Sequence, residues 1–98
     1  MEKRKPHCPL ARVKTLVAAG KVSFTRAALE SGDLLGFDRN GIAAVVMDLT
    51  SRDFYKSMTT YHDHKTWQDV YQPVTTAGVV YIKFTVVEDV LVVSFKEL

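Results

Sequence analysis

The hydrophobic pattern of the first half of the chain has the period of α-helices. One stripe of apolar residues is spaced along the first segment: Leu10, Val13, Leu16 and Val17. Pro9 fits the first helical position, and Gly20 fits the residue that ends the helix. The pattern therefore predicts a helix between Pro9 and Gly20, followed by a short extended segment over 21–24.

Capping residues predict two more helices. Thr25 can cap a helix that runs to about Leu35, with Gly36 as its stop. Asp38 can cap a third helix, whose apolar stripe is the strongest helical signal in the chain: Ile42, Val45, Val46 and Leu49. Val45 lies in the middle of this stripe, so we expect it to be buried.

The second half of the chain changes to the period of β-strands. Aromatic and β-branched residues predict strands over 54–61 and 67–71. Regular alternation predicts two more strands over 79–87 and 90–97, which would form a hairpin around a tight connection at 88–89. Helices followed by antiparallel strands are typical of an α+β fold, here as a single domain of residues 1–98.

Alternation divides the side chains of this hairpin between two faces of the sheet. The apolar face is expected to pack under the helices and contains Val80, Ile82, Phe84, Val86, Leu91, Val93 and Phe95. The opposite face contains Tyr81, Lys83, Thr85, Ser94 and Lys96. A polar, partly basic face with an aromatic residue can bind a nucleic-acid strand, although the solvent side of an ordinary sheet is the more common explanation.

Composition describes an ordinary globular chain, with 47% apolar and 24% charged residues. The single cysteine, Cys8, cannot form an internal disulfide, and no apolar run resembles a signal peptide or a membrane span. We therefore expect a cytoplasmic protein without membrane contact.

Charge adds one feature to this picture. Residues 1–26 hold seven Lys and Arg and one Glu, a net charge of +6, whereas residues 27–98 hold six basic and ten acidic residues, a net charge of −4. A basic first quarter suits an anionic partner such as RNA, although a solvated helix face explains the same charges.

Candidate metal ligands and nucleophiles are few. His62 and His64 form the only metal-like pair, but no further ligands are evident, and a polar loop tip is the favoured interpretation. No residue can be named that would activate Cys8 as a nucleophile. The sequence therefore predicts neither a metal nor another cofactor.

Several segments resemble the MqsR toxin family. They are residues 1–4, 6–7, 53–61 (DFYKSMTTY), 63–64, 67–71 (WQDVY), 89–91 and 93–97. The resemblance covers the whole chain without an evident insertion. It implies the fold of RelE-like and YoeB-like toxins, in which helices pack on one face of a curved antiparallel sheet.

The same resemblance implies a function. Members of the family are messenger-RNA interferases of type II toxin–antitoxin systems, and they cut single-stranded mRNA at short GC-containing sites, preferably GCU. Their partner is the MqsA antitoxin, which has a zinc-binding N-terminal domain and a helix-turn-helix C-terminal domain. A toxin of this kind contacts DNA only indirectly, through its antitoxin.

The resemblance also implies site residues. The family's proposed catalytic positions correspond to Lys56, Gln68, Tyr81 and Lys96. Tyr55 and Met58 match positions linked to substrate recognition. Gln72 departs from the pattern because related chains carry a basic residue there, which puts one phosphate or base contact in doubt. Alternation independently places Tyr81 and Lys96 on the polar face, but it does not select Lys56 or Gln68.

These residue types can cleave RNA without a metal, because the 2′-OH can attack the adjacent phosphorus. Lys56 and Lys96 can hold the non-bridging oxygens, and if they lie close together one of them can serve as the base. Tyr81 can orient or protonate an oxygen, and Gln68 can hold the phosphate or a base edge.

Specificity requires residues that stack on bases. Tyr55, Trp67 and Tyr71 are the candidates, with core packing as the alternative for the last two and the favoured one for Trp67. Two other functions fit the chain: a non-catalytic module that binds single-stranded RNA, and a regulatory adaptor whose basic helical half binds protein or DNA. The set of catalytic positions favours the endoribonuclease.

Overall fold

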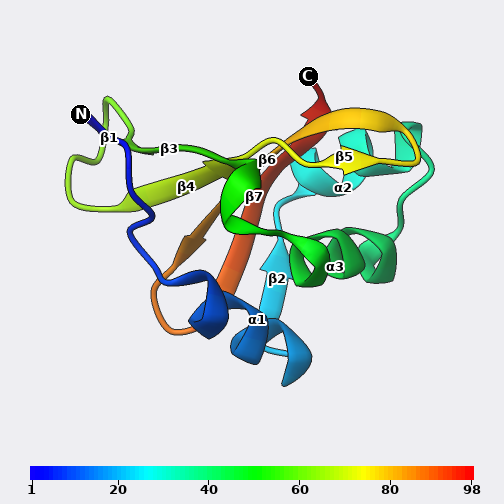
Figure 1. Cartoon of the computed structure of the whole chain (residues 1–98), viewed down its shortest axis with the longest axis horizontal. Coiled ribbons are helices and arrows are strands. Elements are labelled where there is room, and N and C mark those ends of the chain that lie inside the picture. The colour runs from blue at the N-terminus through cyan, green and yellow to red at the C-terminus, as the bar shows by residue number, and fades with distance from the viewer.

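The computed structural model describes residues 1–98 and combines three α-helices with one mixed sheet (Figure 1). The helices are α1 (Leu10–Ala18), α2 (Arg26–Leu34) and α3 (Arg39–Asp48), with a 3₁₀ turn, η1 (Ser51–Asp53). The strands are β1 (Glu2–Lys3), β2 (Val22–Phe24), β3 (Phe54–Thr59), β4 (Trp67–Tyr71), β5 (Val74–Thr75), β6 (Gly78–Val86) and β7 (Val90–Glu97). The predicted α+β fold is confirmed.

The sheet has the strand order β1-β3-β4-β6-β7-β2, and β5 pairs only with β6. All neighbours along this path are antiparallel except β2, which lies parallel to β7. The sheet is therefore mixed rather than wholly antiparallel. None of the three helices has the length and apolar character needed to span a bilayer.

The predicted helix caps are present. Thr25 Oγ1 accepts a hydrogen bond from the Ala28 N–H at 3.1 Å, and Asp38 Oδ1 accepts one from the Gly41 N–H at 2.7 Å. Gly20 and Gly36 end their helices with φ of +76° and +86°, values at which an L side chain is strained. Pro9 is the N-cap of α1 rather than its first helical residue, so this helix begins one residue later than predicted.

One hydrophobic core joins the helices to a single face of the sheet. Its buried members are Cys8, Val13, Val17, Ala28, Ile42, Val46, Leu49, Tyr71, Val80, Ile82, Phe84, Val90, Val92 and Phe95. In α3 the buried residues are Ile42 and Val46, and Leu49, the residue after the helix, is buried as well, whereas Val45 is only partly buried. The expectation that Val45 lies at the centre of the stripe is therefore wrong. Consecutive residues are rotated by about 100° around a helix, so Val45 lies beside the line that faces the core while Val46 lies on it.

A β-bulge changes the face assignment in β7. Phe84 pairs with Val92 and Lys83 pairs with Ser94, so Val93 is an extra residue on β7. The bulge reverses the alternation in the first half of the strand. As a result, Val92 is in the core where Val93 was predicted, while Phe95 and the outward-facing residues after the bulge keep their predicted faces.

The N-terminal segment is fixed to the core side of β4 by one carboxylate. Asp69 is 2% exposed, and its two oxygens accept the backbone N–H groups of His7 and Cys8, each at 3.0 Å. The His7 ring stacks on the Trp67 ring, and the Lys3 ammonium lies 4.2 Å from the centre of the Trp67 ring. Trp67 is therefore covered by the N-terminal segment on the core side of the sheet.

Replacing Asp69 by alanine is expected to lower the free energy of unfolding by about 2–3 kcal/mol, because two N–H groups lose a charged acceptor. Urea denaturation followed by circular dichroism measures this loss. Asp33→Ala is the control, since Asp33 is exposed and its side chain holds no N–H group, so its effect should stay within about 0.5 kcal/mol. Equal stabilities for the two variants would contradict this role of Asp69.

Candidate functional site

Strand pairing gathers polar side chains in a row on the sheet face opposite the core. Lys56 of β3 pairs with Val70 of β4, Val70 pairs with Lys83 of β6, and Lys83 pairs with Ser94 of β7. Directly paired residues of antiparallel strands point to the same side of the sheet. The row therefore crosses four strands on one face, which we call the polar face.

Two further pairs lie beside this row. Met58 pairs with Gln68, and Tyr81 pairs with Lys96. Each pair is two residues along its strands from the row and therefore shares its face. The structure thus brings the four residues implied as catalytic, which are Lys56, Gln68, Tyr81 and Lys96, onto the polar face.

A second bulge explains why alternation did not select Lys56. Phe54 pairs with Tyr71 and Lys56 pairs with Val70, so Tyr55 is an extra residue on β3. Phe54 consequently faces the core, where its ring lies edge-on to Tyr71, whereas Lys56 faces the opposite side. Without the bulge, the two residues would share a face.

The three residues implied in substrate recognition lie around this group. Tyr55 is 42% exposed at the bulge, with the cations of Arg4 and Lys56 5.6 and 5.3 Å from its ring centre. Met58 is half-buried beside Gln68. Gln72 follows β4; its backbone N–H donates to Asp53 O at 2.7 Å, and its side chain makes no hydrogen bond.

Only one of the three stacking candidates is available to a ligand. Tyr71 is 1% exposed and stacks on Phe84 in the core, with ring centres 5.5 Å apart. Burial, followed by the nearby Asp69 carboxylate, raises the pKa of the Tyr71 hydroxyl. Trp67 is covered on the core side of the sheet. Core packing therefore holds for Tyr71, whereas Trp67 is partly buried under the N-terminal segment and is not a member of the core. Tyr55 remains the stacking candidate.

Lys56 is held in its charged form by a carboxylate. Its ammonium donates to Glu2 Oε2 at 2.6 Å, because β1 pairs Glu2 with Met58 and so brings it to the polar face. This hydrogen bond raises the pKa of Lys56 and lowers the pKa of Glu2. Lys56 can therefore bind an anion as a cation, but a raised pKa does not suit the role of base that the sequence left open for it.

Lys83 has the opposite environment. It is half-buried, and its ammonium has no hydrogen-bond or ion-pair partner. Burial lowers its pKa, and the cations of Lys96 and Lys56 lower it further. The sequence placed Lys83 on the polar face but did not include it among the site residues. The available signal was its position two residues after Tyr81, which places both side chains on the same face of the strand.

Tyr81 and Lys96 form a second unit of the site. The Lys96 ammonium lies 5.2 Å from the centre of the Tyr81 ring, and Lys96 is exposed at the end of β7. In Gln68, the Oε1 atom is buried and has no hydrogen-bond partner. A buried polar atom without a partner is costly, so a bound ligand that supplied one would be favoured.

The residues outside this face do not add a metal or nucleophile site. No group of three or more His, Cys, Asp and Glu side chains is arranged to hold a metal ion. His62 and His64 are exposed in a loop that Asp63 organises by accepting hydrogen bonds from Thr66 and the Lys65 N–H. Cys8 is buried, and burial raises the pKa of its thiol, which disfavours the reactive thiolate.

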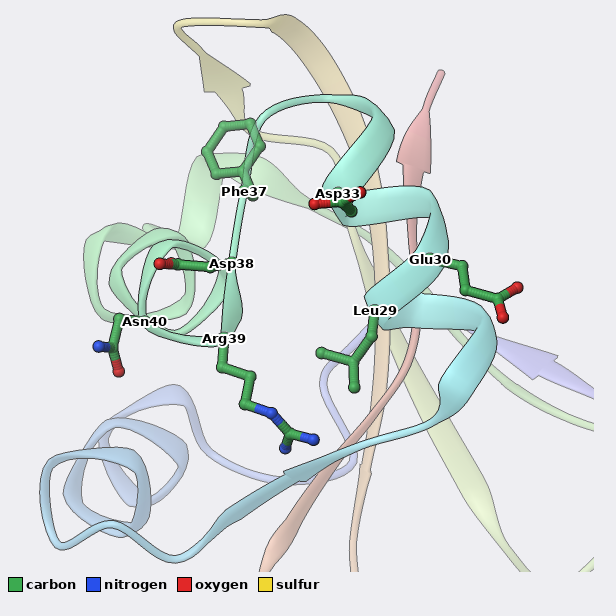
Figure 2. A pocket seen from close by; sticks show the side chains of 7 residues that line it. All are labelled: Leu29, Glu30, Asp33, Phe37, Asp38, Arg39 and Asn40. Carbon is green, nitrogen blue, oxygen red and sulfur yellow. The ribbon is translucent and has the colours of Figure 1, made fainter.

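Two surface hollows lie away from the polar face. The first, of about 600 Å³, separates α2 from the start of α3 and is lined by Leu29, Glu30, Asp33, Phe37, Asp38, Arg39 and Asn40 (Figure 2). Figure 2 shows Leu29 and Arg39 pointing into this space and Glu30 pointing away from it. The second, of about 710 Å³, lies between α3 and residues 73–76. Three carboxylates line the first hollow, and two, those of Asp48 and Asp53, line the second. Neither hollow suits a phosphate chain, so the polar face is the candidate site.

The polar face has the charges and polar groups needed to bind a phosphodiester. Three ammonium groups supply positive charge, and only one carboxylate, Glu2, neutralises part of it. The phenol, the amide and an amine with a lowered pKa are groups that can bind oxygen atoms or move protons.

Comparison with known proteins shows what this chain is similar to. A family model described as "Motility quorum-sensing regulator, toxin of MqsA" matches residues 5–97. A protein of Escherichia coli (strain K12), named mRNA interferase toxin MqsR, is 58% identical over 97 residues, which cover 99% of each chain. The resemblance found in the sequence motifs is therefore confirmed, and this chain belongs to the MqsR toxin family.

Proposed function

We propose that this protein is a toxin that acts as an mRNA interferase, a metal-independent endoribonuclease that cuts single-stranded messenger RNA at GCU-like sites. The observation that carries the proposal is the gathering of Lys56, Gln68, Tyr81 and Lys96 on one sheet face. The 58% identity to a protein named as an mRNA interferase supports it. Because the substrate is messenger RNA, the protein acts in the cytoplasm.

Each group has a role in 2′-OH attack. Lys56, kept protonated by Glu2, binds a non-bridging phosphate oxygen. Lys96 brings a second cation beside the Tyr81 phenol, which protonates the leaving 5′ oxygen. The Gln68 amide holds the phosphate through its N–H groups, or holds a base edge through Oε1, the buried atom that lacks a partner. The products are a 2′,3′-cyclic phosphate and a 5′-OH.

Substrate recognition uses the edge of the same face. Tyr55 is exposed with two cations near its ring, which suits stacking on a splayed base and contact with the flanking phosphate. Met58 contributes an apolar contact next to Gln68. Gln72 replaces a cation by a neutral amide, so we expect a looser preference at one position of the cleavage triplet.

The partner of the toxin is an MqsA-type antitoxin, and the family description "toxin of MqsA" supports this. We expect the antitoxin to have a zinc-binding N-terminal domain and a helix-turn-helix C-terminal domain. Operator DNA is then contacted by the antitoxin and not by this chain.

Cleavage of a defined RNA tests the proposed function. The purified protein, in EDTA, should cut a single-stranded RNA that carries one GCU site and leave a 2′,3′-cyclic phosphate. The same RNA with a 2′-deoxy nucleotide on the 5′ side of the cut should bind but resist cleavage, because the nucleophile is missing. Binding of both RNAs without cleavage would instead show a single-strand RNA-binding module. Binding of neither would overturn the nucleic-acid assignment.

The Lys96→Ala variant is expected to cut at least tenfold more slowly, which corresponds to about 1.4 kcal/mol of barrier. Its thermal unfolding should be nearly unchanged, because Lys96 is exposed near the chain end. Lys65→Ala is the matched control, since Lys65 is an exposed lysine in the loop before β4. A normal cleavage rate would remove Lys96 from the site, and a large loss of stability would make it a structural residue.

A further inference from the structure

Lys83 occupies the middle of the polar face. In the pairing row it is separated from Lys56 only by Val70, and the Tyr81–Lys96 pair lies two residues along its own strand. Val70 is fully buried although it points away from the core, which places it beneath the stems of the lysines that flank it. The Lys83 amine is therefore carried on a stem packed into the floor of the site.

The surroundings of Lys83 contain positive charge and no free carboxylate. The titratable groups facing it are Lys56 of β3, Tyr81 of its own strand and Lys96 of β7. Glu2 of β1 is engaged by Lys56. Val70, its β4 neighbour, carries no charge. A half-buried cation among two other cations destabilises the folded protein, and such unfavourable arrangements are typical of functional sites.

Two lysines on one face thus have contrasting environments. Lys56 donates to a carboxylate, whereas Lys83 has no partner. Neighbouring titratable groups whose environments differ in this way usually divide the roles of charged group and proton acceptor between them.

Resting on the proposed ribonuclease function, we propose that Lys83 is a further catalytic residue: its neutral amine accepts the proton of the attacking 2′-OH. As that proton moves to Nζ, the 2′ oxygen forms a bond to phosphorus and the bond from phosphorus to the 5′ oxygen breaks. Tyr81 donates a proton to the 5′ oxygen and is reprotonated from solvent, and Lys83 returns its proton to solvent. Lys56 and Lys96 stay charged throughout.

Three variants separate a base from a charged anchor and from a structural lysine. Lys83→Met keeps an apolar stem over Val70 and removes the amine. Lys83→Arg keeps a cation that cannot lose its proton at working pH. Lys65→Met removes an exposed lysine outside the face and serves as the control.

Cleavage by Lys83→Met and by Lys83→Arg should fall at least about a hundredfold, the usual range for loss of a general base, while Lys65→Met should cut normally. All three should bind the 2′-deoxy RNA within a few fold of the unmodified protein. The unfolding temperature of Lys83→Met should be unchanged or higher, because a repelled cation is removed. A residue with only a structural role would lower it.

The pH profile gives a readout specific to the base. A base works when deprotonated, so the cleavage rate should fall tenfold per pH unit below the pKa of Lys83, which lies below the ordinary lysine value of 10.5. Lys83→Arg should lose this dependence. A Lys83→Ala protein should regain part of its activity with added ethylamine, in proportion to the free-base form of the amine.

Each other outcome overturns the inference. Full activity of Lys83→Arg would show that only charge matters, and full activity of Lys83→Met would remove Lys83 from the reaction. A loss of deoxy-RNA binding as large as the loss of cleavage would make Lys83 a binding residue. Failure of the unmodified protein to cut any RNA is a different result, because it rejects the ribonuclease function itself.

Discussion

The Val46→Asp protein is expected not to fold. Val46 is fully buried in α3 and belongs to the core that joins the helices to the sheet. A carboxylate placed there would have no partner, and such burial costs several kcal/mol. The whole domain is expected to be stable by about 5–15 kcal/mol, so this single change removes most or all of that margin. Circular dichroism and thermal unfolding of the purified variant measure the effect.

The neighbouring residue provides a matched control. Val45 is only partly buried and borders the hollow between α3 and residues 73–76, so the carboxylate of Val45→Asp can reach water. Val45→Asp should fold with a cooperative transition at a lower temperature. If the two variants unfold alike, the orientation of α3 against the sheet is wrong.

Tyr81→Phe is expected to reduce cleavage by about a hundredfold or more, because the variant lacks the hydroxyl that protonates the leaving oxygen. The aromatic ring remains, and with it the contact with the Lys96 ammonium at 5.2 Å. Thermal unfolding and binding of the 2′-deoxy RNA should therefore stay close to those of the unmodified protein. Single-turnover cleavage of the GCU-containing RNA is the measurement.

Tyr81→Ala separates the hydroxyl from the ring. This variant loses both, so its cleavage should be about as low as that of Tyr81→Phe, with an additional modest loss of stability from the missing cross-strand contact. A fully active Tyr81→Phe beside an inactive Tyr81→Ala would assign the ring to packing or stacking. Poor binding of the deoxy RNA by both variants would assign Tyr81 to recognition.

Local chemistry made much of the fold predictable. Thr25 and Asp38 cap their helices as expected, and Gly20 and Gly36 end the preceding ones, because capping depends only on residues within one helical turn. The strand Trp67–Tyr71 has the predicted bounds. The short strands β1, β2 and β5 were not predicted as strands, apart from an extended segment at 21–24, since two or three residues carry no measurable period.

The candidate site was predictable in two different ways. Tyr81 and Lys96 follow from alternation, because β6 is regular up to Lys83 and the end of β7 lies beyond its bulge. Lys56 and Gln68 came only from the resemblance of their surrounding motifs to a known family. Lys83 could be assigned to the face by alternation, but nothing local indicated that it would be partly buried between two cations.

The sequence by itself therefore determined the helices, their ends, the main strands and the family to which the chain belongs. Only the tertiary structure decided which residues meet. The bulges at Tyr55 and Val93 arise from the pairing of two strands, and each reverses the faces of the residues on one side of it. The partner of Glu2 is Lys56, which lies on another strand more than fifty positions away along the chain. The two cations near Lys83, which are Lys56 and Lys96, also lie on other strands. The charged neighbours of a side chain, and the face of the sheet to which it points, depend on the register between strands. No local sequence pattern contains that register.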